Sequence, residues 1–342
     1  MSRVGRYSRG DVRYRVFPEP MSPRAKARGG IDLGGTKIQT VIVGARNQVI
    51  GAARTETPQQ GGPAAIAAAM AECLREAAAT GGYETADLIG IGVGSPGEVD
   101  DRKGTVAGAR NLSEWIEPFP LRNELKKALG APVHIGNDVQ VATTGEFELG
   151  AAKPYKSVLG VFWGTGVGGG IVLDGSDWLG RGAAGEIGHM VVKKGGAKCP
   201  CGNRGCMEAY AGRAAMEAEA RRRHDKGEKT DLFKLMKHKG KDRLTSSVWG
   251  KALHHEDKLA TDLLERAVDA LGAGIASAVN LLDVEAVILG GGLGIRFGDE
   301  LGPAIEKRMH ESLFDHDNPP DFHVAALGDL GGAIGAALLA KS

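Results

Sequence analysis

The chain is poor in cysteine, in net charge and in long apolar segments, and each shortage excludes a class of protein. Four cysteines among 342 residues, three of them clustered, fit a reducing cytoplasm rather than export. The 43 Lys and Arg residues against 42 Asp and Glu residues leave a net charge of +1, which gives no global attraction to nucleic acid or membranes. No apolar run is long enough to cross a bilayer, and residues 1–28 lack the apolar core of a signal peptide. We therefore expect a cytoplasmic protein that binds neither nucleic acid nor membrane.

The length and the glycine content favour a folded chain of more than one domain. The 342 residues are enough for two domains with cores of their own. The 53 glycines fall in clusters between apolar runs, a pattern typical of strands that end in glycine-rich turns. Residues 1–28 carry eight Lys or Arg residues, two acids and several prolines, so we expect a disordered basic tail there. Binding of an anion or a partner is the alternative role for this tail.

Apolar strands that end in glycine alternate with helical segments in the rest of the chain, which predicts an α/β fold with parallel or mixed sheets. The order of strand, Gly-Thr turn and returning strand near residues 30–51 is repeated near residues 158–176. Such a repeat indicates a duplicated core with one glycine-rich loop from each half. Helices are expected over residues 139–149, 207–223, 259–282, 300–313 and 331–340, with a charged solvent-facing helix or lid over residues 221–245.

Three sulfurs and one imidazole gather in a short glycine-rich segment, as His189, Cys199, Cys201 and Cys206. This set is typical of a closed, tetrahedral, structural zinc site. Gly202 and Gly205 allow the tight turn that such a site needs. The alternatives are a disulfide between neighbouring cysteines, which would be strained at that spacing, or three unrelated core cysteines. A zinc ion would also fix Glu186 and Glu208, which flank the ligands, and Cys73 is expected to be a buried apolar residue of a helix.

Three glycine-rich loops at strand ends are candidates for phosphate binding. The first loop joins two strands, and its glycines let backbone N–H groups approach an anion. Asp32 is placed to hold magnesium through water. An ordinary tight hairpin is the alternative, and the loop lacks the Gly-Lys-Ser/Thr of a Walker motif. The predicted nucleotide contacts are Asp32, Gly34, Gly35, Thr36 and Lys37 in the first loop, and Thr165, Gly166, Gly291 and Gly292 in the others.

Asn137 and Asp138 follow a short strand and precede a helix. Asp is a favoured N-cap, so capping the helix is one role for Asp138. The other role is that of a general base, because a helix N-terminus keeps a carboxylate ionised. Asn111, in a loop, has both the donor and the acceptor that a sugar diol needs.

Taken together, these motifs resemble the sugar kinases of the ROK family (repressors, open reading frames, kinases) over about residues 29–342. Residues 32–37 resemble the first phosphate motif of the family, residues 136–138 its catalytic Asp segment, and Asn111-Leu112 its sugar-contacting Asn. The most specific likeness is Gly-Glu-Ile-Gly-His at 185–189, followed by Cys-Pro-Cys-Gly-Asn-Arg-Gly-Cys-Met-Glu at 199–208, which resembles the zinc and substrate motif.

The resemblance implies the two-domain fold of actin-like ATPases and sugar kinases, with ATP and sugar in an interdomain cleft, and a homodimer or homotetramer. We expect a small domain of residues 29–136 plus about 326–342, and a large domain of residues 137–325 that holds the zinc. The 28 residues before the first phosphate motif are too few for the winged helix of the family's repressors. By likeness, the sugar contacts are Asn111, Asn137, Asp138, Glu186, His189 and Glu208.

The resulting prediction is a glucokinase of glycolysis that uses ATP and Mg²⁺, with Asp138 as the general base. A kinase for fructose, mannose or an N-acetylhexosamine is the first alternative. A sugar-sensing protein without turnover is the second, and the presence of Asp32 and Asp138 argues against it. Polyphosphate stays open as the phosphoryl donor because of the basic tail.

Overall fold

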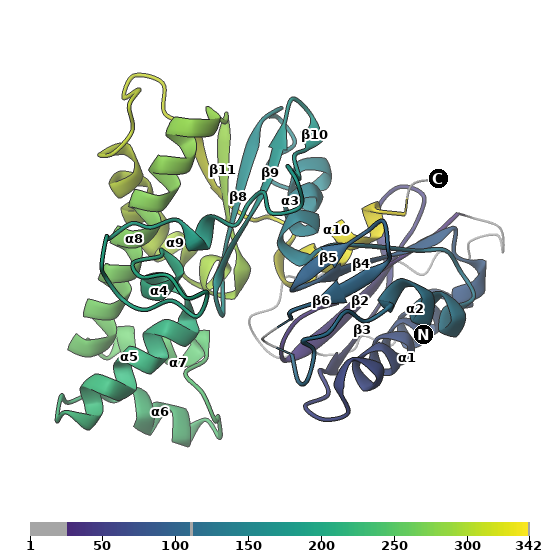
Figure 1. Cartoon of the computed structure of the whole chain (residues 1–342), viewed down its shortest axis with the longest axis horizontal. Helices are drawn as coiled ribbons and strands as arrows, with labels where there is room; N and C mark the ends of the chain where they lie inside the picture. Colours follow the sequence, from purple (N-terminus) through teal and green to yellow (C-terminus); the bar gives the residue numbers. More distant parts are fainter. Residues whose placement is uncertain (1–25, 110–111, 341–342) are drawn as a thin grey trace, which may run out of the picture. The chain divides into compact units, whose positions relative to one another are not determined.

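The computed structural model describes residues 26–109 and 112–340, and these form two compact units (Figure 1). The first unit runs to Leu149 and is completed by the C-terminal segment from Ala326, and the second runs from Gly150 to Ala325. Among the described helices, none has the length and apolar character needed to cross a membrane.

The first unit is built on a mixed five-stranded sheet in the order β3-β2-β1-β4-β7. Strand β1 pairs antiparallel with β2 and parallel with β4, and β4 pairs parallel with β7. The strands are β1 (Arg28–Leu33), β2 (Lys37–Val43), β3 (Val49–Glu56), β4 (Gly90–Ser95) and β7 (Val133–Asn137), with a separate hairpin of β5 (Glu98–Asp100) and β6 (Thr105–Ala107). The helices are α1 (Gly62–Gly81), η1 (Thr85–Asp87), α2 (Leu121–Leu129), α3 (Asp138–Leu149), η3 (Gly328–Leu330) and α10 (Gly331–Leu338).

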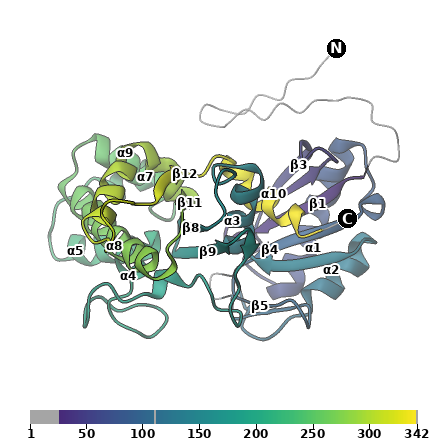
Figure 2. The ribbon, with the colours of Figure 1, turned by 90° about the horizontal axis from the view of Figure 1, so that it is seen from above.

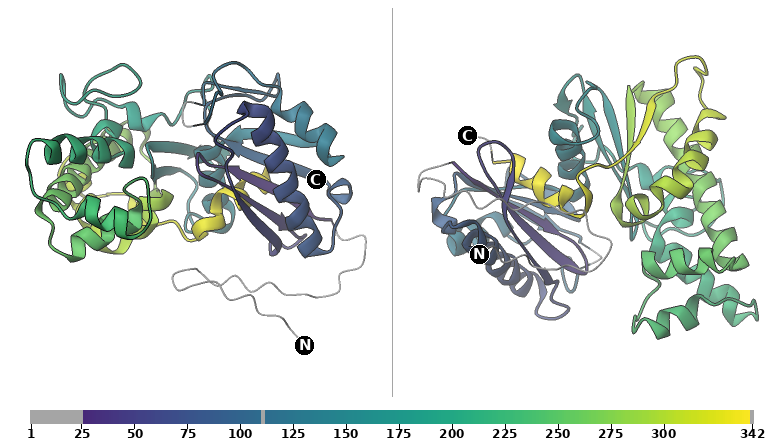
Figure 3. Two further views of the ribbon diagram at one scale, coloured as in Figure 1. Left: turned by 90° about the horizontal axis from the view of Figure 1, so that it is seen from below. Right: turned by 180° about the vertical axis from the view of Figure 1, so that it is seen from behind.

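Helix α10 packs beside α3 and against β1 and β4 (Figure 2), while α1 lies over β2 and β3 (Figure 3). Two glycines on the strands make the approach of α10 close. A Cβ on Gly30 would lie 2.0 Å from the carbonyl oxygen of Ala333, and one on Gly92 would lie 1.7 Å from that of Ala336. Because no larger residue fits at either position, the backbone of α10 lies directly on β4 and on β1, the strand that leads into the loop of residues 32–37.

The second unit repeats this sheet, in the order β10-β9-β8-β11-β12. Strand β8 pairs antiparallel with β9 and parallel with β11, as β1 does with β2 and β4, so the predicted duplication is confirmed. The strands are β8 (Val158–Trp163), β9 (Val167–Leu173), β10 (Ser176–Asp177), β11 (Ala286–Gly290) and β12 (Asp321–Val324). The helices are η2 (Ile187–His189), α4 (Glu208–Ala211), α5 (Arg213–Asp225), α6 (Leu232–His238), α7 (Ser246–His254), α8 (Lys258–Leu282) and α9 (Gly291–His310).

The structure corrects the expected domain boundary. The first domain was expected to end at residue 136, but helix α3 belongs to the first unit because it packs against α10. That unit therefore extends to Leu149.

Three expected helices also differ. The helix expected over residues 207–223 is broken at Gly212, where the N–H groups of Arg213 and Ala214 donate instead to carbonyl oxygens of the 164–165 loop. The helix expected at 300–313 begins at Gly291 and carries Pro303 inside it. The charged stretch 221–245 is not only a solvent-facing element, because Leu232 and Leu244 in it are fully buried.

Candidate active site and metal cluster

The first phosphate loop is the tight turn between β1 and β2. Its Gly34 N–H donates to the carbonyl oxygen of Lys37 at 2.9 Å, which closes the turn. The end of β3 holds the turn from outside, since the hydroxyl of Thr57 donates to the carbonyl oxygen of Gly34 at 2.6 Å and its N–H to that of Thr36 at 3.1 Å. The loop is therefore fixed by its own backbone and by one neighbour, as an anion-binding loop requires.

Asp32 lies at the end of β1, and its surroundings shift its pKa more than that of any other titratable group in this loop. Burial raises the pKa of Asp32 to about 6, Lys37 opposes that shift, and Asp329 adds to it. Asp329 itself pairs with the ammonium of Lys37 and accepts from Gln39 Nε2 at 3.1 Å. A desolvated carboxylate of this kind suits a divalent cation, whose charge offsets the cost of ionisation.

The start of helix α10 also approaches Asp32. A Cβ on Gly332 would come within 2.7 Å of the Asp32 carboxyl carbon, so only glycine leaves room there. Asp32 and Lys37 were predicted from the sequence, whereas Asp329 and Gly332 were not.

The junction of β7 and α3 separates the two roles considered for Asn137 and Asp138. The side-chain oxygen of Asn137 accepts from the N–H groups of Val139 and Gln140, both at 3.1 Å. Asn137 is therefore the N-cap, and the proposal that Asp138 caps the helix is wrong. Asp138 is the first residue of α3, and its Oδ1 accepts from the N–H of Val139 at 2.9 Å. Its carboxylate stands at the positive end of the helix dipole.

In the second unit, two of the predicted nucleotide loops meet. The turn after β8 is closed by a hydrogen bond of 2.9 Å from the N–H of Gly164 to the carbonyl oxygen of Gly166. A Cβ on Gly164 would lie 3.9 Å from the amide nitrogen of Gly292, at the start of α9. Gly291 has a φ of +80°, and a Cβ there would lie 2.5 Å from the carbonyl oxygen of Trp163. Thr165 and Gly166 thus lie beside the N-terminus of a long helix, an arrangement that suits phosphate.

Glu208 connects this loop to the cysteine segment. Its Oε2 accepts a hydrogen bond of 2.9 Å from the N–H of Val167, the first residue of β9. A Cβ on Gly166 would lie 2.1 Å from the same oxygen, so the absence of a side chain lets the carboxylate reach the backbone. From the sequence, Glu208 was expected beside the metal ligands and against a sugar, and its bond to Val167 was not expected.

Glu186 and His189 are brought to the same strand by a second glycine. A Cβ on Gly188, between them in η2, would lie 1.9 Å from the carbonyl oxygen of Val167. The Nε2 atom of His189 lies 3.9 Å from Oε2 of Glu186. Three of the predicted sugar contacts are therefore gathered around the start of β9: Glu186, His189 and Glu208.

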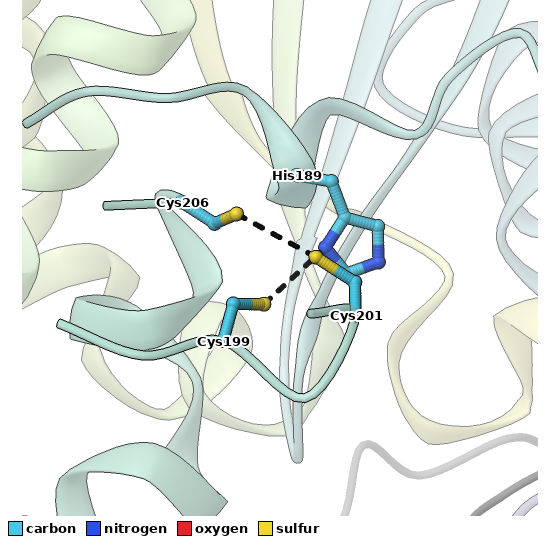
Figure 4. Close-up of side chains that lie close together, drawn as sticks. All are labelled: His189, Cys199, Cys201 and Cys206. Carbon is cyan, nitrogen blue, oxygen red and sulfur yellow. Dashed lines mark hydrogen bonds between the residues drawn. The ribbon is translucent and has the colours of Figure 1, made fainter. Parts of the chain in front are cut away.

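The four predicted metal ligands lie together, with their ligand atoms all within 4.8 Å of one another (Figure 4). Tetrahedral zinc with bonds of about 2.3 Å to sulfur and 2.0 Å to nitrogen puts two sulfurs about 3.8 Å apart, and a sulfur and a nitrogen about 3.5 Å apart. The Sγ atoms of Cys201 and Cys206 lie 3.7 Å apart, and Sγ of Cys199 lies 3.6 Å from Nδ1 of His189. The donor set and its spacing fit zinc, and the Nε2 atom of His189 remains on the side of Glu186. Cys73 lies outside the cluster and is buried, as predicted.

The model of the ROK family matches residues 28–342. This chain belongs to the ROK family. A glucokinase of Halalkalibacterium halodurans is 33% identical, over 91% of this chain and 94% of the relative. An N-acetylgalactosamine kinase of a Shewanella species is 32% identical, over 91% of this chain and 95% of the relative. The crystal structure of a ROK glucokinase from Streptomyces griseus, in complex with glucose and AMPPNP, is 31% identical with a TM-score of 0.78 and covers 92% of this chain and 98% of that one.

The fold is accordingly the actin-like ATPase fold of the ROK sugar kinases, as predicted. The predicted site residues of this ROK protein divide between its two units. Asn137 and Asp138 lie in the first unit, with the loop of residues 32–37. Glu186, His189 and Glu208 lie in the second. Asn111 and most of the basic tail lie outside the described residues.

Proposed function

We propose that this ROK protein is a sugar kinase that transfers the γ-phosphoryl group of ATP to the 6-hydroxyl of glucose. The observation that carries the proposal is the junction of β7 and α3. Because Asn137 caps the helix, Asp138 is the first residue of α3, where its carboxylate can serve as a base. Family membership and the glucokinase names of relatives at about 30% identity support the substrate class.

In this reaction Asp138 accepts the proton of the 6-hydroxyl. The hydroxyl oxygen forms a bond to the γ-phosphorus as the bond from that phosphorus to the bridging oxygen of ADP breaks. Asp138 lies at the positive end of the α3 dipole, which stabilises a carboxylate there and suits it to accept the proton as the nucleophile forms. A general base of this kind contributes about 10²–10⁴ in rate.

The loop of residues 32–37 and the loops around Thr165, Gly166, Gly291 and Gly292 hold the nucleotide. Their backbone N–H groups and the ammonium of Lys37 donate hydrogen bonds to the phosphate oxygens. Asp32 holds Mg²⁺, which neutralises charge on the phosphates when bound. The raised pKa of Asp32 supports this role, because a bound cation stabilises the ionised carboxylate.

The sugar contacts proposed are those given by the family likeness, namely Asn111, Asn137, Asp138, Glu186, His189 and Glu208. Zinc in the cysteine cluster braces the last two and has no catalytic task, since four protein ligands leave no position for water. Two features support this division of labour. His189 directs Nδ1 toward the cysteines and Nε2 toward Glu186, and Glu208 follows Cys206 closely in sequence. A homodimer or homotetramer remains a prediction from the family likeness.

A coupled assay with glucose, mannose, fructose and N-acetylglucosamine tests the proposal. Glucose should exceed fructose and N-acetylglucosamine by about tenfold or more in kcat/KM, because a buried polar group left unpaired costs about 1–3 kcal/mol. If N-acetylglucosamine, fructose or N-acetylgalactosamine, the sugar named for one relative, turns over faster, the assignment of glucose fails and the kinase class stands. Saturable sugar binding without turnover of any sugar would favour the sensing protein instead.

A further inference from the structure

Arg213, the first residue of helix α5, meets the second phosphate loop directly. Its Nη2 donates to the hydroxyl oxygen of Thr165 at 2.8 Å, and its Nη1 donates to the carbonyl oxygen of Leu244 at 3.3 Å. The backbone N–H groups of Arg213 and Ala214 donate to the carbonyl oxygens of Gly164 and Thr165. The side chain and backbone of Arg213 therefore hold together the loop of residues 164–166, the start of α5 and the segment before α7.

This contact decides what the hydroxyl of Thr165 can offer a ligand. A guanidinium only donates hydrogen bonds, so Oγ1 of Thr165 is the acceptor and its own proton is left to donate elsewhere. Thr165 is exposed, and it stands beside Gly166 and near Gly292. The hydroxyl is thus set as a donor at a loop whose glycines already favour an anion.

A second arginine adds positive charge at the same place. Arg243 lies close enough to Arg213 to lower the pKa of that guanidinium, in addition to the larger effect of burial. Arg243 forms no hydrogen bond or ion pair with any other described residue. The carboxylate that acts on Arg213 is that of Glu217, and it already binds Arg221 at 2.6 Å and the N–H of Leu244 at 2.8 Å.

Two like charges held near each other, one of them desolvated, are costly unless an anion joins them. We propose that Arg213 and Arg243 bind the phosphate chain of the phosphoryl donor beside Thr165. The kinase function proposed above supplies the identity of this anion. The anion site itself rests on the contact of Arg213 with Thr165 and on the position of Arg243 next to Leu244, whose carbonyl oxygen accepts from Arg213. A nucleoside triphosphate and inorganic polyphosphate offer the same phosphate chemistry, and the experiment separates them.

Binding of inorganic tripolyphosphate to the whole chain, measured by titration calorimetry without sugar, tests the site apart from turnover. Arg243→Gln should weaken binding by about tenfold, because charge-assisted hydrogen bonds to phosphate are among the strong ones. Arg213→Lys keeps the charge but loses the planar fork, and it should weaken binding by about threefold to tenfold. Arg222→Gln is the matched control, since Arg222 lies on the same helix and is already paired with Glu219 at 2.7 Å; its affinity should stay that of the wild type.

Steady-state kinetics then identify the source of the phosphate chain. In Arg243→Gln, KM for the donor should rise about tenfold, while kcat and the KM for sugar should change little. This pattern is expected when an interaction that is equally strong in the ground state and the transition state is lost. A rise confined to ATP assigns the site to the nucleotide, and a rise for both ATP and long-chain polyphosphate assigns it to either donor. Tripolyphosphate affinity and donor KM within about twofold of wild type in both arginine variants would overturn the inference. An equal loss in Arg222→Gln would overturn it too, because net charge alone would then explain the effect.

The two proposals fail separately. If no sugar is phosphorylated but Arg243→Gln still loses tripolyphosphate binding, the anion site stands and the kinase function falls. If the enzyme turns over and tripolyphosphate binds the variants as it binds the wild type, the kinase function stands and the assignment of Arg213 and Arg243 falls.

Discussion

The carboxylate of Glu208 accepts a hydrogen bond from the backbone N–H of Val167 at 2.9 Å. Glu208 begins α4 just after the cluster residue Cys206, and Val167 begins β9 just after the loop of residues 164–166. One side chain therefore ties the metal cluster to a predicted phosphate loop. Under the proposed function, a residue that touches the sugar also sets the position of the loop that holds the donor.

Replacing Glu208 with Ala should therefore raise KM for the donor as well as for the sugar. A hydrogen bond to a charged group contributes about 1.5–3 kcal/mol, so we expect about a tenfold rise in the sugar KM and a several-fold rise in the donor KM. Glu208→Gln keeps an oxygen acceptor for Val167 and should affect the sugar KM alone. Both constants are obtained from initial rates with each substrate varied in turn.

Glu186→Gln serves as the control for this experiment, since Glu186 lies near His189 and its side chain forms no bond to the phosphate loop among the described residues. It should raise only the sugar KM. A donor KM that is unchanged in Glu208→Ala would show that the bond to Val167 does not position the loop.

Because Asn137 is the N-cap, a substitution of Asp138 can test its role as general base without removing the cap. Asp138→Asn should lower kcat by about 10²–10⁴ while the sugar affinity and the melting temperature stay close to wild type. Asn137→Ala, in contrast, should lower the free energy of unfolding by about 1 kcal/mol, because the N-cap is lost. Single-turnover rates and thermal unfolding of both variants separate the two effects. Turnover of Asp138→Asn near the wild-type rate would exclude Asp138 as the base.

Local patterns were enough to predict the main strands and the metal cluster. Apolar runs ending in glycine form β1, β4, β8 and β11 because each strand is buried on both faces and turns sharply at its end. The four ligands of the cluster could be identified because residue type and spacing alone define a structural zinc site.

Tertiary contacts explain what the sequence did not reveal. Asp329 lies 292 positions after Lys37, and no local pattern connects the two. In the sequence, Arg213 is one of many cations in a charged segment, and only the fold shows that it binds Thr165. Asn137 and Asp138 are equally good N-caps by composition, so only the hydrogen bonds could show that Asn137 has that role.

The metal cluster predicts about one zinc per chain. Elemental analysis of the purified protein checks this number, and Cys206→Ser should reduce it. Under the proposal that zinc braces Glu208 and His189, the variant should also bind sugar more weakly, with a higher KM. Cys73→Ala is the matched control, because Cys73 lies outside the cluster and should keep the metal and the KM. A metal-free preparation with the wild-type KM would contradict the bracing role.

Asp32→Asn should stabilise the protein in the absence of nucleotide and magnesium, although it should abolish most of the activity. Burial raises the pKa of Asp32 to about 6, from the 3.8 of an exposed group. A carboxyl whose pKa is raised on folding costs stability once it ionises, so the cost is present above about pH 6 and vanishes as the pH falls below about 4. A shift of about two units corresponds to at most about 3 kcal/mol. The amide carries no charge at any of these pH values and avoids this cost.

Urea unfolding of the wild type and Asp32→Asn at pH 8, 6 and 4 measures the effect. The variant should be more stable at pH 8, and the difference should shrink as the pH is lowered, because the wild-type carboxyl becomes protonated in both states. Asp299→Asn, which changes an exposed carboxylate of α9, should differ from wild type by less than about 0.5 kcal/mol at each pH. A less stable Asp32→Asn at pH 8 would mean that Asp32 is a structural partner of Lys37 rather than a carboxylate kept desolvated for a cation. Stability gained together with activity lost is the combination expected of a group retained for function.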